Sequence, residues 1–105
     1  MTEVSLHEEG DLITLAIQGH AEYADDGADI VCAACSALSG TFATMIRNLP
    51  VPANIKFDSG RTKISINRKD SGIYALQIKY AIDFVMLGYN LLAEQYPDNV
   101  IITQW

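Results

Sequence analysis

The chain has 105 residues, of which 50 % are hydrophobic and 19 % charged, and its formal net charge is −6. This length fits a single domain over residues 1–105, and the composition excludes a disordered chain. The charge distribution disfavours direct nucleic-acid binding, because residues 1–46 contain no Lys or Arg and phosphate neutralisation needs a basic stripe.

The sequence also argues against a secreted or membrane-spanning protein. Its first residues are polar and acidic, unlike a signal peptide. The longest apolar run is interrupted by Lys79, Asp83 and Gly88, too often for a membrane span. We therefore expect a cytoplasmic protein, and in that reducing compartment the two cysteines are expected to stay free.

The first half of the chain predicts a hairpin, a loop and a helix. Apolar and polar side chains alternate in residues 3–8 and 12–18, on either side of the turn at Glu9 and Gly10. Residues 19–28 break this period and are expected to form a loop. The helix then begins after the N-cap Asp29 and ends before two prolines, Pro50 and Pro52. Its expected buried face consists of Val31, Ala34, Leu38, Thr41, Phe42, Met45 and Leu49.

The second half predicts another hairpin, a second helix and a last strand. Residues 55–57 and 63–67 flank Asp58-Ser59-Gly60-Arg61, which is a turn signal. A cap-like Asp70-Ser71-Gly72 precedes the longest periodic run, which Pro97 ends, and residues 100–105 read as a strand.

These elements predict an α+β fold of order ββαββαβ, with two long helices packed on small antiparallel sheets. The second helix is apolar on nearly every side. We therefore expect it in the middle of the fold or against another subunit.

The loop and the start of the first helix carry the candidate chemistry. Behind the N-cap Asp29, Cys32 is the third helical residue, where free N–H groups and the helix dipole favour a thiolate and could hold an oxyanion. His20 is expected to act as base toward the thiol and then as acid toward a leaving amine. Gly19 and Gly27 flank the loop and are expected to be hinges that let it close on a substrate.

Several neighbouring residues have two or more interpretations. Asp29 caps the helix, orients His20 or binds substrate backbone. Ser36 donates to the thiolate or, more often for such residues, bonds its own helix backbone. Cys35 is expected to lie in the core. The acidic loop residues either keep the protein soluble or attract a basic substrate; they are Glu22, Asp25 and Asp26.

Part of the sequence resembles the signature of the bacterial ribosomal-processing cysteine protease family, called Prp. The resemblance implies an endopeptidase that removes the N-terminal extension of a large-subunit ribosomal protein precursor, with Cys32 as nucleophile and His20 as its partner. It also implies a homodimer, and a substrate with apolar and aromatic residues before the cut and lysines after it. Asp29 and Ser36 match motif positions with a supporting role. The matching residues are Gly19-His20-Ala21, Gly27, Asp29-Ile30-Val31-Cys32-Ala33-Ala34 and Ser36-Ala37.

Other functions stay open on the residues alone. Cys32-Ala33-Ala34-Cys35 is a C-x-x-C pair at a helix start, as in thiol redox proteins, although the chain lacks their alternating βαβ units. A non-catalytic ribosome-associated binding module would use the acidic face to hold a basic tail. A zinc site from His7, His20 and the two cysteines fits no compact spacing, so we expect no metal and no cofactor.

Overall fold

The computed structural model describes residues 1–25 and 27–105, and it confirms the α+β class and the order ββαββαβ. The helices are α1 (Ile30–Arg47) and α2 (Ala75–Gln95), and a short 3₁₀ helix, η1 (Lys69–Tyr74), precedes α2. The strands are β1 (Thr2–Glu9), β2 (Leu12–Gln18), β3 (Ala53–Asp58), β4 (Arg61–Asn67) and β5 (Val100–Gln104).

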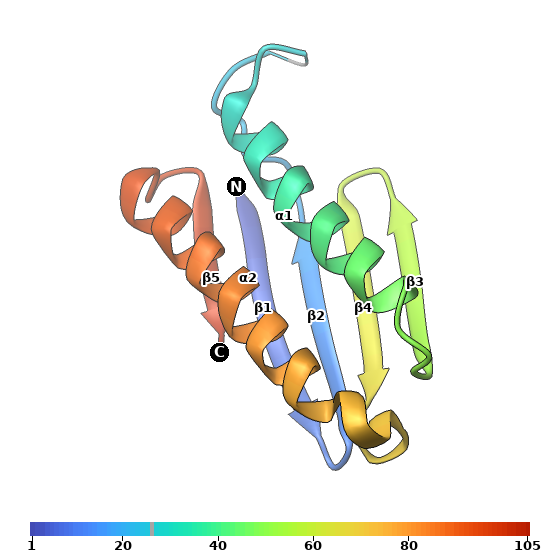
Figure 1. The fold of residues 1–105 in the computed structure, drawn as a ribbon. Coiled ribbons are helices and arrows are strands. Elements are labelled where there is room, and N and C mark those ends of the chain that lie inside the picture. Colours follow the sequence, from blue (N-terminus) through green and yellow to red (C-terminus); the bar gives the residue numbers. More distant parts are fainter. Residues whose placement is uncertain (26) are drawn as a thin grey trace.

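All the strands belong to one sheet of order β3-β4-β2-β1-β5, and both helices cross the same face of it (Figure 1). Both predicted hairpins form, and the pairing of β2 with β4 joins them. The sequence pattern predicts small antiparallel sheets. The structure has a single mixed sheet instead, because the chain returns through α2 and places β5 parallel to β1.

The core lies between the sheet and the two helices. Alternate side chains of β1, β2 and β4 are buried on the helix side, as period-2 patterning requires. The Tyr89 side chain of α2 is fully buried, and its hydroxyl donates to the Cys35 carbonyl of α1 at 3.0 Å. This bond fixes the two helices to each other. The sheet contributes Val4, Leu6, Ile13, Leu15, Ile17, Ile64 and Ile66 to the core.

The buried face of α1 differs from the expected one. Val31 and Phe42 are buried as predicted, but Thr41 and Met45 are exposed. The predicted face of α1 contains the large apolar side chains of the sequence pattern. The face that contacts the sheet also contains small residues. Leu38 packs instead toward Gly88 of α2, so part of the expected face lines the groove between the helices. The buried residues of α1 are Val31, Cys35, Ser39, Phe42, Ala43 and Ile46.

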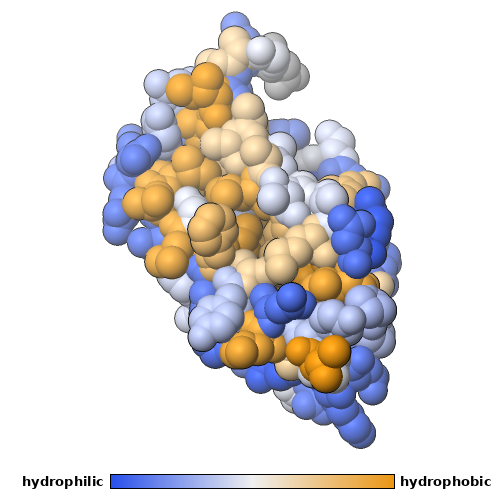
Figure 2. All heavy atoms as spheres, viewed as in Figure 1, coloured by the Kyte–Doolittle hydropathy of each residue, from blue (hydrophilic) through white to orange (hydrophobic). Residues whose placement is uncertain are grey.

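The second helix also departs from the expectation in two respects. The cap-like residues 70–72 lie within η1, and α2 begins at Ala75 without a side-chain cap. Only one face of α2 is in the core, so the helix is not in the middle of the fold. Large apolar side chains cover its other face, which contributes to the hydrophobic surface over the helices in Figure 2. They are Leu76, Tyr80, Phe84, Leu87 and Leu91.

Within the described chain, α1 alone is long and apolar enough, by length and composition, to cross a membrane. The same test is passed by core helices of globular domains. In this structure one face of α1 packs on the sheet, with Val31 and Ile46 fully or almost fully buried.

Candidate active site

The sheet topology brings four chain segments to one end of the molecule. Gln18, at the end of β2, pairs with Arg61 at the start of β4 and with Glu3 near the start of β1. Val100, at the start of β5, pairs with Thr2. The loop after β2, the β3–β4 turn, the N-terminus and the α2–β5 turn therefore meet here, beside the N-terminus of α1.

Asp29 ties the loop to the helix. Its Oδ1 accepts hydrogen bonds from the N–H groups of Val31 and Cys32, at 3.0 and 2.9 Å, which confirms the predicted N-cap. Its Oδ2 accepts from the N–H groups of Tyr23 and Ala24, at 2.9 and 3.4 Å. These bonds, led by the one from Cys32, lower the pKa of the Asp29 carboxyl below its usual value.

Cys32 is the third residue of α1 and is partly buried. Its sulfur accepts a hydrogen bond from the Ala21 N–H at 3.3 Å. The N–H groups of Val31 and Cys32, considered above as holders of an oxyanion, are bonded to Asp29. The positive end of the helix and the Ala21 N–H are thus the features that favour a negative charge on this sulfur.

The His20 ring packs against the β3–β4 turn. Gly60 in that turn has a φ of +70°, and a Cβ there would come within 2.8 Å of His20 Nε2. The Gly19 N–H donates to the Gly60 carbonyl at 2.7 Å, and the Met1 amine donates to the His20 carbonyl at 2.7 Å. A Cβ on Gly19, whose φ is +89°, would collide with the Met1 carbonyl. Both glycines are therefore favoured by their backbone conformation, and Gly19 is also required by its close approach to the Met1 backbone.

His20 and Cys32 line one cleft of about 290 Å³. The structure therefore brings the predicted catalytic pair to the same site. Ser36, one turn further along α1, lies on the same wall, and among the described residues its hydroxyl bonds neither the thiol nor the helix backbone. Gly27, the second predicted hinge, also has a positive φ, of +85°. Asp26 lies outside the described residues.

Known proteins resemble this chain in sequence and in fold. The model of the family described as cysteine protease Prp matches residues 1–101. The chain belongs to this family of peptide hydrolases. The ribosomal processing cysteine protease Prp of Staphylococcus aureus is 24 % identical over 99 residues, covering 93 % of this chain and 92 % of that protein.

Solved structures share the fold. The S. aureus Prp protease in complex with a covalently linked product peptide gives a TM-score of 0.78 at 23 % identity, over 100 % of both chains. The same protease in complex with a substrate peptide gives 0.72 at 20 % identity, over 99 % of this chain and 97 % of that one. A Streptococcus mutans protein gives 0.67 at 23 % identity, over 99 % and 93 %.

Other residues that line this cleft cannot be recognised as site residues from the neighbouring sequence. The hairpin of β3 and β4 contributes four residues to the lining of the cleft: Phe57, Asp58, Arg61 and Thr62. The sequence shows these residues only as parts of a hairpin. Thr2 of β1 also lines the cleft. Their contribution depends on the β2–β4 and β1–β2 pairings, which join segments far apart in the chain.

The two thiols differ in environment. Cys35 is 5 % exposed, as expected of a core residue, and burial raises the pKa of its thiol to about 11, with smaller contributions from Cys32 and Asp29. Both cysteines are free. In a thiol redox cycle Cys35 would be the resolving thiol, and its raised pKa lowers the fraction of reactive thiolate at this position near neutral pH.

No group of three metal-ligating side chains occurs in the described part of this Prp-family chain. His7, considered above with the cysteines as a zinc ligand set, lies on β1, where its ring is 3.1 Å from the Gln104 side-chain amide.

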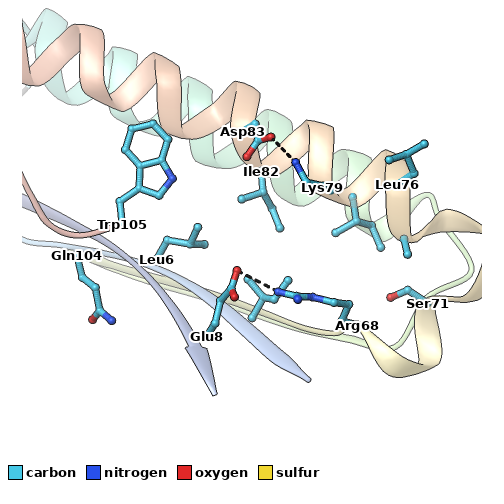
Figure 3. Close-up of a pocket in the computed structure, with 13 residues that line it drawn as sticks. Leu6, Glu8, Arg68, Ser71, Leu76, Lys79, Ile82, Asp83, Gln104 and Trp105 are labelled. Atoms are coloured by element: carbon cyan, nitrogen blue, oxygen red, sulfur yellow. Dashed lines mark hydrogen bonds and ion pairs between the residues drawn. The ribbon is translucent and has the colours of Figure 1, made fainter. Parts of the chain in front are cut away.

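A larger cavity, of about 790 Å³, lies at the other end of β1 (Figure 3). Its polar walls carry ion pairs between Arg68 and Glu8, at 3.0 Å, and between Lys79 and Asp83, at 3.2 Å. Trp105 stands beside it in Figure 3. Among the described residues its lining contains neither cysteine nor histidine.

Proposed function

We propose that this chain is a cysteine endopeptidase with Cys32 as nucleophile and His20 as general base. The observation that carries the proposal is the shared cleft, which is lined both by a thiol at the N-terminal end of a helix and by an imidazole. A helix N-terminus favours the thiolate, and a histidine can take and return one proton near neutral pH.

The proposed reaction passes through an acyl-enzyme. His20 takes the thiol proton, and the sulfur of Cys32 attacks the carbonyl carbon of the scissile peptide bond. The C–N bond then breaks, and the leaving amine takes the proton from His20. A water molecule, deprotonated by His20, attacks the resulting thioester. The C–S bond breaks, the new carboxyl group is released, and the proton on His20 returns to the Cys32 sulfur. The supporting role of Asp29 is to hold the loop and the helix start together through both of its carboxylate oxygens.

We propose that closure of the loop completes the site. In the structure the thiol takes its hydrogen bond from Ala21 and the His20 ring lies against Gly60. Gly19 and Gly27, both at positive φ, are the proposed hinges, and the movement would turn the His20 ring from Gly60 toward the thiol while the Ala21 N–H stays on the Cys32 sulfur. Ser36 is proposed as a second supporting residue, because its position one turn after Cys32 is on the wall of the cleft.

The proposed substrate is a large-subunit ribosomal protein precursor with an N-terminal extension. Two features of the cleft suit a peptide with apolar or aromatic residues before the cut and lysines after it. Phe57 offers a half-exposed ring on the wall. The one guanidinium among the described lining residues is that of Arg61. The carboxylates of Asp58, Glu22 and Asp25 outnumber it and give net acidic surroundings that attract lysines. We place this activity in the bacterial cytoplasm, without a membrane, a cofactor or direct contact with nucleic acid.

The test is cleavage of a precursor peptide, with the cut located by mass spectrometry. The wild-type protein should cut a peptide that spans the extension and leave the mature sequence intact. Cys32→Ala should abolish the cut, and Cys35→Ala, a matched change three residues further along α1, should retain it. Undiminished cutting by Cys32→Ala would refute the assignment of the nucleophile. Salt-dependent binding without cutting by the wild type would favour the ribosome-associated binding module.

We also propose that the protein is a homodimer that buries the exposed face of α2. Phe84 is 77 % exposed, and it lies on the wall of an apolar groove between α1 and α2 that also includes Leu38 and Leu91. An apolar surface of this kind is typical of an interface between subunits. Figure 2 shows it as the orange area over the helices.

The dimer proposal is tested by sedimentation velocity. Phe84→Glu should convert the dimer to a monomer, because it places a charge in the apolar interface. Ile101→Glu is the matched control, since Ile101 is also exposed but lies on β5. A wild-type protein that sediments as a monomer at all concentrations would refute this proposal and leave the catalytic one untouched.

A further inference from the structure

The α2–β5 turn is hydrogen-bonded to the loop that carries His20. The Asn99 side-chain amide donates to the Ala21 carbonyl at 2.9 Å. Ala21 is fully buried, and its own N–H donates to the Cys32 sulfur at 3.3 Å. One residue therefore links the Asn99 side chain to the proposed nucleophile.

We propose that Asn99 is a positioning residue for the cysteine protease reaction. By holding the Ala21 carbonyl, it keeps the adjoining N–H aimed at the Cys32 sulfur, where that N–H stabilises the negative charge of the thiolate. This inference rests on the proposed function, because it concerns the same sulfur.

The backbone of Asn99 is fixed independently of its side chain. Its N–H donates to the Tyr96 carbonyl at 2.9 Å, and its carbonyl accepts from the Thr2 N–H at 2.8 Å. The Tyr96 ring makes an edge-to-face contact with Tyr23 of the loop, at 5.3 Å between centroids. A change of the Asn99 side chain therefore removes the bond to Ala21 while the turn keeps its place beside β1 and the loop.

The loop needs such a restraint. Glu22, the residue after Ala21, has a φ of +58°, a left-handed conformation that is unfavourable for a residue with a side chain. Conformations of this kind persist where neighbouring contacts hold them. The Met1 amine holds the His20 carbonyl before Ala21, and Asn99 holds the Ala21 carbonyl itself. Without Asn99 the peptide group between Ala21 and Glu22 loses this restraint. A resulting shift of the Ala21 Cα would also move the Ala21 N–H, which belongs to the preceding peptide group and points at the Cys32 sulfur.

The experiment compares Asn99→Ala and Asn99→Asp with Asp98→Ala. Aspartate has the shape of asparagine but cannot donate to a carbonyl, so it removes the bond with little change in packing. Asp98 is the exposed neighbour of Asn99 in the same turn, so its variant controls for any change there. Three quantities are measured: kcat and KM on the precursor peptide, the melting temperature, and the rate at which iodoacetamide alkylates Cys32 as a function of pH.

Both Asn99 variants should lower kcat about tenfold and leave KM within about twofold, the size expected when one hydrogen bond to an ionised group is lost. The pH of half-maximal alkylation at Cys32 should rise by about one unit for the same reason. Asp98→Ala should match the wild type in both. A merely structural role of Asn99 would lower the melting temperature without moving the alkylation profile.

The proposal is overturned if both Asn99 variants match Asp98→Ala in kcat and in the alkylation profile, whatever their melting temperatures. If Asn99→Ala fails to fold, Asn99→Leu, which is similar in size, adds no charge and cannot donate, decides by the same criteria. The alkylation arm does not depend on proteolysis. A wild-type protein that cuts no precursor would therefore refute the proposed function, while the shift in alkylation would still decide whether Asn99 acts on the sulfur through Ala21.

Discussion

Two concave regions lie at opposite ends of β1, and they differ in what lines them. The cavity beside Glu8 has a volume of about 790 Å³, and the cleft beside Thr2 has about 290 Å³. The charged groups of the larger one are already paired, Arg68 with Glu8 and Lys79 with Asp83. The smaller one holds a thiol and an imidazole.

The candidate active site in this fold is therefore identified by the side chains that line it and not by the volume of the cavity. A nucleophile needs a feature that stabilises its ionised form, and the N-terminus of α1 and the Ala21 N–H supply it at Cys32. The larger cavity offers exposed ion pairs, which contribute little to stability and supply no group that attacks a carbonyl. Its size reflects the gap between η1, α2 and the C-terminal strand.

The first prediction compares His20, which lines the smaller cleft, with His7, which contacts the lining residue Gln104 of the larger cavity. His20→Ala should lower kcat/KM by about 10²- to 10⁴-fold, because it removes the general base of the proposed mechanism. His7→Ala should leave cleavage within about twofold, since His7 contacts Gln104 beside the larger cavity. The measurement is the initial rate of precursor cleavage across pH. Equal losses in the two variants would contradict the assignment of the site to the smaller cleft.

The sequence predicts the elements of this fold more fully than its site. Alternating side chains, turn signals and prolines are local, and they place both hairpins, α1 and β5. The pair Cys32 and His20 is also visible locally, since both residues lie in one motif of the chain. Asp29 is recognisable as an N-cap for the same reason.

The rest of the site depends on pairings between distant segments. Gly60 lies beside His20 because β4 pairs with β2, and Asn99 reaches Ala21 because β5 pairs with β1. Neither contact leaves a periodic signal in the sequence. The buried face of α1 is predicted incorrectly for another reason. Cys35 and Ser39 on this face are small, whereas the neighbouring face has larger apolar side chains and is therefore the one that the hydrophobic pattern indicates.

The second prediction concerns the capping carboxylate of the smaller cleft. The pKa of Asp29 is lowered from 3.8 by hydrogen bonds that exist only in the folded state, led by the one from the Cys32 N–H. The ionised carboxylate therefore stabilises the fold above about pH 4, and this stabilisation is lost as pH falls through the lowered value. Asp29→Asn should unfold at a lower urea concentration than the wild type at pH 7, and the gap should close toward pH 3.

Asp25→Asn is the matched control, because Asp25 is exposed on the same loop and its backbone carbonyl, not its carboxylate, accepts from the Ala28 N–H. Cleavage by Asp29→Asn should also slow several-fold, since the neutral amide holds the Tyr23 and Val31 N–H groups less strongly than the carboxylate does. A gap in urea midpoint that stays constant from pH 7 to pH 3 would show that the charge of Asp29 plays no part.

The third prediction tests the larger cavity directly. Arg68→Ala removes an ion pair whose side chains are 45 % and 56 % exposed, so the free energy of unfolding should change by no more than about 1 kcal/mol. Precursor cleavage should stay within about twofold of the wild type. Thermal unfolding and the cleavage assay measure the two effects on one sample. A loss of activity as large as that of His20→Ala, at unchanged stability, would mean that substrate reaches across the sheet to both regions, and the smaller cleft would then be only part of the site.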